Sequence, residues 1–302
     1  MKSKKYILLV VNPIAGNTEK DTIISSVEKE TSTRNLRLKI YKTTGEDDEK
    51  AICNILKEET PWRILVAGGD GTISMVAECI LNTDICLGII PSGSANGLAV
   101  NFDLPPTLEG QIHVALSDFT LKIDTLTING NLSLHIADLG INAELIENYE
   151  NSGIRGKLGY FLQSIPTLFN TESPFKFFIE TEEGTVEQSG ILLAIANANK
   201  FGTGANINPN GRMNDGNFEI LVFKSLDFIE ILKTAQDNPQ LSSDFVHAIS
   251  TKRAKITTKG EVPFQIDGEY IGKTSEVSVS IERESLAIAV PEMFFNLQSQ
   301  KQ

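Results

Sequence analysis

Apolar runs that each lead into a helical pattern dominate the first 125 residues of the chain. Four runs have the length and composition of buried strands, and each is followed by a turn and by apolar positions at helical spacing. The strands are expected at residues 6–11, 36–41, 63–67 and 85–90, and the helices at 18–30, ending near 56, at 73–81 and near 98–100. Strands that alternate with helices predict a doubly wound, Rossmann-like α/β domain, whose ligands bind beyond the carboxyl ends of the strands.

The pattern changes to short alternating strands after about residue 123. Asn129-Gly130 is a hairpin signal between strands expected at 122–128 and 132–136. Further strands are expected at 175–181, 190–196, 218–223, 253–258, 262–266 and 276–282, with helical segments near 155–169 and 226–236. We therefore expect an α/β domain of residues 1–123 and an antiparallel β-sandwich domain of residues 124–290, with residues 291–302 packed back on the first domain.

Composition narrows the class of protein. At 302 residues, 41% hydrophobic and 22% charged, the chain is typical of a soluble globular protein. Its net charge of -12 argues against a general nucleic-acid binder. The N-terminal apolar run is too short for a signal peptide or a membrane span, so we expect a cytoplasmic chain without a transmembrane segment.

The spacing of the three cysteines matches no known metal-binding or redox motif. Cys53, Cys79 and Cys86 lack CxxC spacing and lie in apolar patterns. We expect buried reduced thiols rather than a disulfide or a metal site.

The glycine-rich segment 68–72, GGDGT, joins the third expected strand to its helix. Glycines let a backbone come close to a polyphosphate, and the N–H groups of the helix point at the same place. Because Asp70 is itself an anion, its presence indicates a divalent cation or ordered water beside the phosphates. The alternative is a plain turn, since the Walker and GxGxxG patterns are absent. Three of the four turns combine Gly with Asn, Ser or Asp, which favours a nucleotide site with Mg²⁺.

Five short motifs resemble those of the diacylglycerol-kinase-type lipid kinases, a superfamily that also holds sphingosine and ceramide kinases. They occur in family order over nearly the whole chain. The motifs are Asn12-Pro13-x-Ala15-Gly16, Gly68-Gly69-Asp70-Gly71-Thr72, Pro91-x-Gly93-Ser94-x-Asn96, Asn214-Asp215-Gly216 and Ile266-Asp267-Gly268-Glu269. One match would be weak evidence, but five together are strong.

This resemblance implies ATP-dependent phosphorylation of a lipid hydroxyl, with the nucleotide in a cleft between an α/β domain and a β-sandwich domain. Thr43 falls where relatives carry a nucleotide-contacting threonine, although the adjacent Thr44 loosens that alignment. The residues that the resemblance implies for ATP are Asn12, Thr43, Gly68, Gly69, Asp70, Gly71, Thr72, Ser94 and Asn96.

The late carboxylates are the implied catalytic groups. In bare sequence Asp267-Gly268 is first of all a hairpin turn. The resemblance implies that Asp267 or Glu269 takes the proton from the acceptor hydroxyl, and that Asp70 belongs to the catalytic set. Loss of such a base lowers the rate by about 10²–10⁴.

A structural Mg²⁺ is implied at the turn that holds Asp215. In similar bacterial lipid kinases the Asp carboxylate and nearby main-chain carbonyls bind it, which correspond here to Asp215, Arg212 and Asn217. Asn217 replaces a residue that is usually apolar in relatives, which leaves the geometry of this site open. Carbonyl and carboxylate oxygens are hard ligands of the kind that Mg²⁺ prefers.

The identity of the lipid stays open in the sequence. Gly97 stands where diacylglycerol kinases usually carry Asp, and residues 93–99 are closer to sphingosine and ceramide kinases. Residues 157–169 are apolar enough to line a lipid groove or to touch a membrane, with core packing as the alternative. Lys252-Arg253-x-Lys255 is either solvated strand charge or a contact to an anionic membrane.

We expect, in sum, a cytoplasmic lipid kinase that is peripheral at the membrane, uses ATP and Mg²⁺, acts on a lipid substrate and binds no nucleic acid. The oligomeric state is open, a homodimer included. An NAD kinase is the first alternative, because that related family also carries GGDGT. A non-catalytic nucleotide or lipid sensor is the second, and the missing acid at Gly97 is its support.

Overall fold

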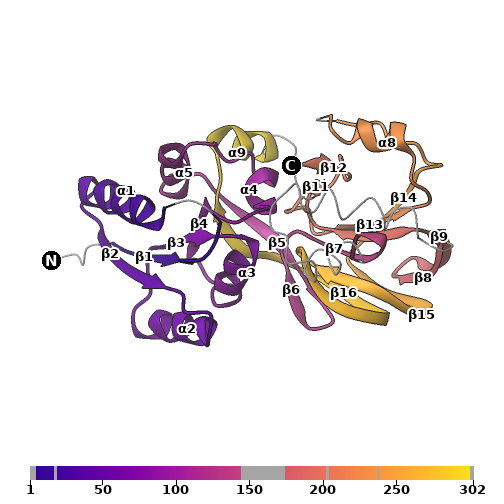
Figure 1. Cartoon of the computed structure of the whole chain (residues 1–302), viewed down its shortest axis with the longest axis horizontal. Coiled ribbons are helices and arrows are strands. Elements are labelled where there is room, and N and C mark those ends of the chain that lie inside the picture. Colours follow the sequence, from indigo (N-terminus) through magenta and orange to yellow (C-terminus); the bar gives the residue numbers. More distant parts are fainter. Residues whose placement is uncertain (1–4, 17–18, 144–173, 202–203, 237, 300–302) are drawn as a thin grey trace. The chain divides into compact units, whose positions relative to one another are not determined.

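The computed structural model describes residues 5–16, 19–143, 174–201, 204–236 and 238–299, which form two compact units (Figure 1). The first unit consists of Met1–Ile123 and Glu284–Gln302, and the second of Asp124–Arg283. Two strands, β5 (Thr120–Ile128) and β16 (Glu269–Ala289), contain the points where the chain passes from one unit to the other.

A parallel sheet forms the first unit. Its strands are β1 (Tyr6–Val11), β2 (Arg37–Lys42), β3 (Arg63–Gly68) and β4 (Cys86–Pro91), in the order β4-β3-β1-β2. Its helices are α1 (Lys20–Thr33), α2 (Asp48–Glu58), α3 (Asp70–Glu78), α4 (Gly97–Asn101), α5 (Leu108–Ala115) and α9 (Glu292–Ser299). β1 and β3 are buried along their whole length, because helices follow each strand and cover the apolar runs.

The end of β16 completes this unit. Ala287 pairs with Cys86 in parallel to β4, and Leu286 and Ile288 are fully buried. Beyond the strand, the ring of Phe294 packs edge-on against Phe102. The return of the chain to the first unit therefore begins at Glu284, inside a strand.

Antiparallel strands form the second unit. They are β6 (Asn131–Ser133), β7 (Ile136–Gly140), β8 (Phe175–Thr181), β9 (Gly184–Gly190), β10 (Leu192–Ala196), β11 (Lys200–Phe201), β12 (Ala205–Asn206), β13 (Phe218–Phe223), β14 (Val246–Thr251) and β15 (Arg253–Ile266). The helix α8 (Phe228–Lys233) lies between β13 and β14. The Asn129-Gly130 turn is present, with φ values of 50° and 85°.

The long strand β15 joins two groups of strands around one core. Its first half pairs with β8 and its last residues pair with β7, with a register irregularity between Thr257 and Val262. The sequence predicts two separate strands here, whereas the structure has one irregular strand. The strand β9 was not predicted, because its residues are mostly polar and exposed and give no apolar alternation. The helix expected near 155–169 lies outside the described residues.

The predicted fold class, a parallel α/β unit followed by an antiparallel β-sandwich, is confirmed by these pairings. Among the described residues, no helix has the length and hydropathy needed to cross a membrane.

The expectation of three reduced thiols was wrong. Cys53 in α2 and Cys79, which follows α3, form a disulfide with their Cα atoms 5.3 Å apart, and Cys86 is free and buried. The pairing arises because the two helices pack against each other, a contact that cysteine spacing along the chain does not encode.

Candidate functional site

The turns that carry the N-terminal motifs emerge from one edge of the parallel sheet. Backbone hydrogen bonds continue past the strand ends, from Asn12 N–H to the Ala67 carbonyl and from Thr43 N–H to the Val11 carbonyl, each 2.9 Å long. Ser92 N–H donates in the same way to the Gly68 carbonyl. The turns after β1, β2, β3 and β4 therefore lie side by side, as the strand order requires.

Asn12 ties the first of these turns to helix α3. Its Oδ1 accepts a hydrogen bond from Ile14 N–H at 3.1 Å, and its Nδ2 donates to Thr72 Oγ1 at 3.0 Å. Thr72 is buried in the first turn of α3. Asn12 and Thr72, both predicted from sequence as nucleotide contacts, are thus brought together.

Glycine is required where these turns meet. A Cβ atom on Gly93 would lie 2.5 Å from the Cα of Gly69, and one on Gly16, which has φ of 55°, would lie 2.3 Å from the Ser92 carbonyl oxygen. The Ser92 hydroxyl is buried and has no hydrogen-bond partner in the described part of the chain. We call the turns 12–16, 68–72 and 92–97 the glycine cradle. Its backbone N–H groups, the hydroxyl of the exposed Ser94 and the N-terminus of α3 have the chemistry that phosphate oxygens need.

Asp70 and Asn96 shape one wall of the glycine cradle. The Asp70 carboxylate accepts hydrogen bonds from Gly97 N–H at 2.8 Å and Leu98 N–H at 3.1 Å, at the start of α4. Asn96 closes the turn on itself, since Oδ1 accepts from Gly93 N–H and Nδ2 donates to the Gly93 carbonyl. Because the donors to Asp70 are backbone N–H groups, these hydrogen bonds do not depend on which side chain position 97 carries.

The remaining predicted contacts differ in exposure. Ser94 is exposed at the tip of the turn after β4, Gly71 is exposed in α3, and Thr43 is half-buried after β2. Lys20, which the sequence analysis did not select, donates from Nζ to the Ala15 carbonyl at 2.5 Å, and burial lowers the pKa of its ammonium group. No motif marks Lys20, because it is simply the first polar residue of α1.

In the second unit, Asp267 is surrounded by donors. It occupies the β15–β16 turn with φ of 49° and accepts from Ser133 Oγ and from three consecutive backbone N–H groups, at 2.7–3.0 Å. The backbone donors are Leu134, His135 and Ile136. Burial raises the pKa of the Asp267 carboxyl, while these donors oppose that rise because they favour the charged form.

Glu269 contrasts with Asp267, because it is exposed at the start of β16. The turn that presents it rests on a buried polar network. Gln265 Oε1 accepts from Gly268 N–H at 2.7 Å, and Gln265 Nε2 donates to the Asp138 carboxylate, which also accepts from Asn142 Nδ2. Burial raises the pKa of Asp138 to about 7. Asp138 lies in an apolar run, so no local pattern marks it.

The predicted metal ligands lie on a turn held by a residue that sequence reasoning missed. The buried Asp124 accepts from Gly216 N–H at 2.7 Å, and its own N–H donates to the Met213 carbonyl. Asp215 is exposed and accepts from Asn217 N–H at 3.0 Å.

A second carboxylate stands near that turn. Burial raises the pKa of Glu219, and the negative charge of Asp215 raises it further. The Glu219 carboxylate also accepts from Asn208 Nδ2 at 2.7 Å and from Ser250 Oγ at 3.1 Å, and both hydrogen bonds lower its pKa. Carboxylate and carbonyl oxygens are the hard ligands that Mg²⁺ prefers, so the oxygen types at this turn fit that ion.

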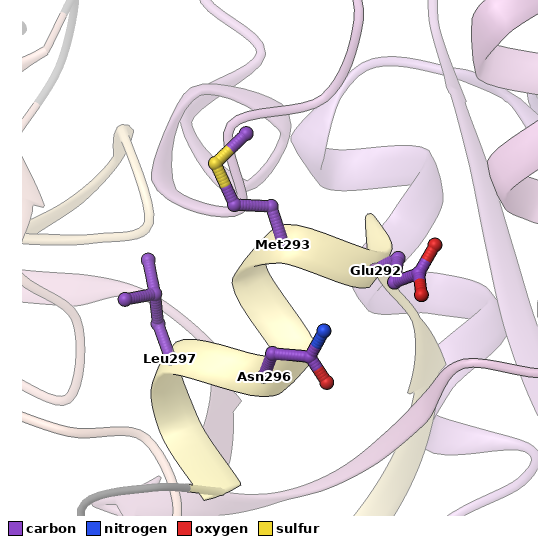
Figure 2. A pocket seen from close by; sticks show the side chains of 4 residues that line it. All are labelled: Glu292, Met293, Asn296 and Leu297. Atoms are coloured by element: carbon purple, nitrogen blue, oxygen red, sulfur yellow. The ribbon is translucent and has the colours of Figure 1, made fainter.

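A shallow cavity of about 320 Å³ lies on α9, lined by Glu292, Met293, Asn296 and Leu297 (Figure 2). All four residues come from one short helix, and none belongs to a motif. This cavity is therefore unrelated to the candidate site.

Comparison with known proteins gives matches over nearly the whole chain. Residues 6–128 match the diacylglycerol kinase catalytic domain, and residues 136–290 match the YegS C-terminal NAD kinase beta sandwich-like domain. A diacylglycerol kinase of Staphylococcus haemolyticus is 22% identical over 302 residues, which covers 97% of this chain and 90% of that protein. The resemblance that the five motifs indicated is thereby confirmed.

Two solved structures share the fold. A diacylglycerol kinase from Bacillus anthracis gives a TM-score of 0.74 at 18% identity, and covers 97% of this chain and 100% of its own. An NAD kinase from Archaeoglobus fulgidus in complex with ATP gives a TM-score of 0.54 at 13% identity, with 98% of each chain covered. At these identities the likeness concerns the arrangement of strands and helices alone.

Proposed function

Since the chain belongs to the family of diacylglycerol-kinase-type lipid kinases, we propose that it transfers the γ-phosphate of ATP to a hydroxyl group of a lipid. The observation that carries this proposal is the glycine cradle, whose turns meet at backbone contact and leave the buried Ser92 hydroxyl unpaired among the described residues. The family match selects a kinase among the proteins that bind phosphate in this way.

In this proposal the ATP phosphates bind in the glycine cradle. The backbone of residues 68–72, the hydroxyl groups of Thr72 and Ser94, and the N-terminus of α3 hold the phosphate oxygens. Asn12, Thr43 and Asn96 line the same edge of the sheet, and Asp70 keeps the turn after β4 in place through its bonds to α4. Lys20 adds a positive charge at the turn after β1.

We assign the base to Glu269 and a positioning role to Asp267. Three donors converge on Asp267 Oδ1 and a fourth binds Oδ2, so both oxygens of that carboxylate are engaged, whereas Glu269 is open to solvent. Glu269 takes the proton of the lipid hydroxyl while the oxygen of that hydroxyl forms a bond to the γ-phosphorus. The bond from that phosphorus to the bridging oxygen breaks, and ADP leaves with the electron pair.

For the metal, we propose that Asp215 and the main-chain carbonyls of Arg212 and Asn217 hold Mg²⁺, with Glu219 adding negative charge nearby. A bound Mg²⁺ supplies positive charge that neutralises carboxylates and phosphate oxygens. Asp124 fixes the backbone of the turn from the buried side.

The acceptor is diacylglycerol, a sphingoid base or a related lipid alcohol, and the protein works in the cytoplasm as a peripheral membrane enzyme. The test is incubation of the protein with γ-labelled ATP, Mg²⁺ and detergent-dispersed diacylglycerol, sphingosine, ceramide or monoacylglycerol, with NAD in parallel. We expect label in one of the lipids. Label in NADP alone would identify an NAD kinase, and label in no acceptor would favour a sensor; either result contradicts the proposal.

The assignment of the base is tested with a pair of variants. Glu269→Gln should lower kcat by about 10²–10⁴ and leave the unfolding temperature and ATP binding unchanged. Asp267→Asn should lower the free energy of unfolding by about 1–3 kcal/mol, because the new amide group faces backbone donors. Glu261→Gln, an exposed glutamate of the same hairpin, is the matched control and should behave as the wild type. A fully active Glu269→Gln enzyme would rule out this assignment.

A further inference from the structure

Helix α8 presents its apolar side to solvent and its acidic side to the protein. Phe228 is 72% exposed, Ile229 69% and Leu232 57%, whereas Glu230 is buried. Successive residues of a helix turn by about 100°, so the apolar residues share one side and Glu230 lies opposite. An ordinary surface helix has the reverse arrangement. We call Leu226, Phe228, Ile229, Ile231 and Leu232 the α8 ridge.

Polar contacts fix the helix in this orientation. The Glu230 carboxylate accepts from Ser242 N–H at 3.0 Å and from Lys233 Nζ at 2.5 Å. Asn206 N–H donates to the Thr234 carbonyl at 2.7 Å, just beyond the helix. The polar groups on the inner side of α8 are therefore hydrogen-bonded. Because these bonds hold the helix in one orientation, the α8 ridge faces solvent.

The connection that carries the α8 ridge is longer than the topology needs. Strands β13 and β14 are antiparallel neighbours, and such a pair can be joined by about 2–5 residues. Here residues 224–245 join them. Long connections of this kind often carry binding residues, so we expect the α8 ridge to bind a partner.

The size of the α8 ridge argues against a second protein chain as that partner. Its exposed apolar side chains amount to on the order of 500 Å², whereas each side of a stable protein interface buries about 800 Å². A short apolar helical face needs no such area at a bilayer, because the helix lies in the plane of the interface and its apolar face enters by about 5–10 Å. The dimensions fit a lipid surface.

Charge indicates which kind of lipid surface fits. The whole chain has a net charge of -12 and is repelled by an anionic membrane. Around the α8 ridge, Asp227 is bonded to the backbone N–H of Ile229, and Glu230 is paired with Lys233. Residues 224–234 hold two lysines, Lys224 and Lys233, and two acids, so this segment has no net charge and contact with a zwitterionic surface has no electrostatic barrier.

The basic cluster singled out in the sequence is a weaker candidate for membrane contact. Arg253 pairs with Glu182 at 2.6 Å, and Lys255 pairs with Glu276 at 3.1 Å. Both positive charges are therefore already matched by carboxylates, Glu182 in the turn between β8 and β9 and Glu276 in β16.

We propose that the α8 ridge docks this protein on the zwitterionic surface of a lipid bilayer, with Phe228, Ile229 and Leu232 inserted among the lipid headgroups. This inference rests on the proposed function, because a lipid acceptor places the enzyme at a bilayer. It adds the residues that make the contact and the apolar nature of that contact.

The test is flotation of the full chain with phosphatidylcholine vesicles, without ATP, at 0.1 and 0.5 M salt. We expect the wild type to float with the vesicles at both salt concentrations, since apolar insertion is not screened. Phe228→Ser with Ile229→Ser should lower the bound fraction about tenfold or more. The matched control is Met293→Ser with Leu297→Ser, which removes two exposed apolar side chains of α9 and should leave flotation unchanged.

Three results would overturn the proposal. These are wild-type flotation by the Phe228/Ile229 variant, flotation that requires anionic lipid or disappears at 0.5 M salt, and a wild-type dimer that the variant converts to a monomer in light scattering. Phosphoryl transfer to detergent-dispersed lipid is measured separately and should be unaffected in the variant. A wild type that floats but transfers no phosphate would contradict the proposed function alone. A Phe228/Ile229 variant that transfers phosphate but does not float has lost docking and kept the activity.

Discussion

Single carboxylates in this protein have roles that depend on their hydrogen-bond donors. Asp70, Asp124 and Asp267 each accept from backbone N–H groups and hold a turn in place. Glu269 and Asp215 are exposed. The motifs identify these residues as important, but only the positions of the donors distinguish an acid that shapes the backbone from one that can meet a substrate or a metal.

The buried Asp138 predicts a pH dependence of stability. The folded protein keeps the proton of Asp138 up to about pH 7, whereas the unfolded chain releases it near pH 4. Between these values the folded state binds more protons, so the free energy of unfolding falls as pH rises, by ~3 kcal/mol from this group between pH 5 and pH 8. Urea denaturation at pH 5 and pH 8 measures the difference.

Asp138→Asn is the control for that experiment. The amide oxygen can still accept from Gln265 and Asn142, and the variant no longer titrates. The stability difference between pH 5 and pH 8 should shrink, with a remainder from Glu219, whose pKa burial also raises. An undiminished difference in the variant would mean that other groups cause it.

At the scale of residues, sequence patterns pointed to the candidate site residues that belong to a motif and missed those that do not. Asn12, Thr72 and Asn96 were selected and lie in the glycine cradle. Asp124, Asp138, Ser92 and Lys20 were not selected, because a buried polar residue in an apolar run or at a helix start has no local signature. The importance of Asp124 and Asp138 comes from contacts over long sequence separations, with Gly216 and Gln265 respectively.

At the scale of elements, strand patterns were predicted well where burial was strong. β1, β8 and β13 have the predicted limits, because each is an apolar or alternating run bounded by turn residues. The contact between α2 and α3 was beyond prediction, since it depends on which helix faces meet. That contact determines the state of two cysteines.

The disulfide between Cys53 and Cys79 closes a loop of 26 residues and should stabilise the first unit by about 2–4 kcal/mol. Dithiothreitol should therefore lower the unfolding temperature of the wild type. Thiol titration of the denatured, unreduced protein should find one free thiol, that of Cys86.

Cys53→Ser with Cys79→Ser is the matched variant, and its unfolding temperature should be insensitive to dithiothreitol. Three titratable thiols in the wild type, or equal unfolding temperatures with and without the reductant, would contradict this prediction.

At the scale of the whole molecule, the first unit is built from two separate stretches of chain. Leu286, Ile288 and Val290 are fully buried, and burial of each such side chain contributes about 1.5–3 kcal/mol. We expect a fragment of residues 1–123 to lack a cooperative thermal transition in circular dichroism. The same fragment joined through a flexible linker to residues 284–299 should regain it. A cooperative transition of the short fragment at the temperature of the joined one would contradict this expectation.

The passage of β16 from one unit to the other also sets an order of events during synthesis. A ribosome makes the motifs of the glycine cradle early, but the strand that pairs with Cys86 of β4 emerges only after residue 283. Until then the edge of β4 has no partner on that side, which is a state that invites pairing with other chains. A nascent chain must therefore extend past residue 288 before the unit proposed to hold ATP can close, so a chain that stops earlier would have an open sheet edge rather than a partial enzyme.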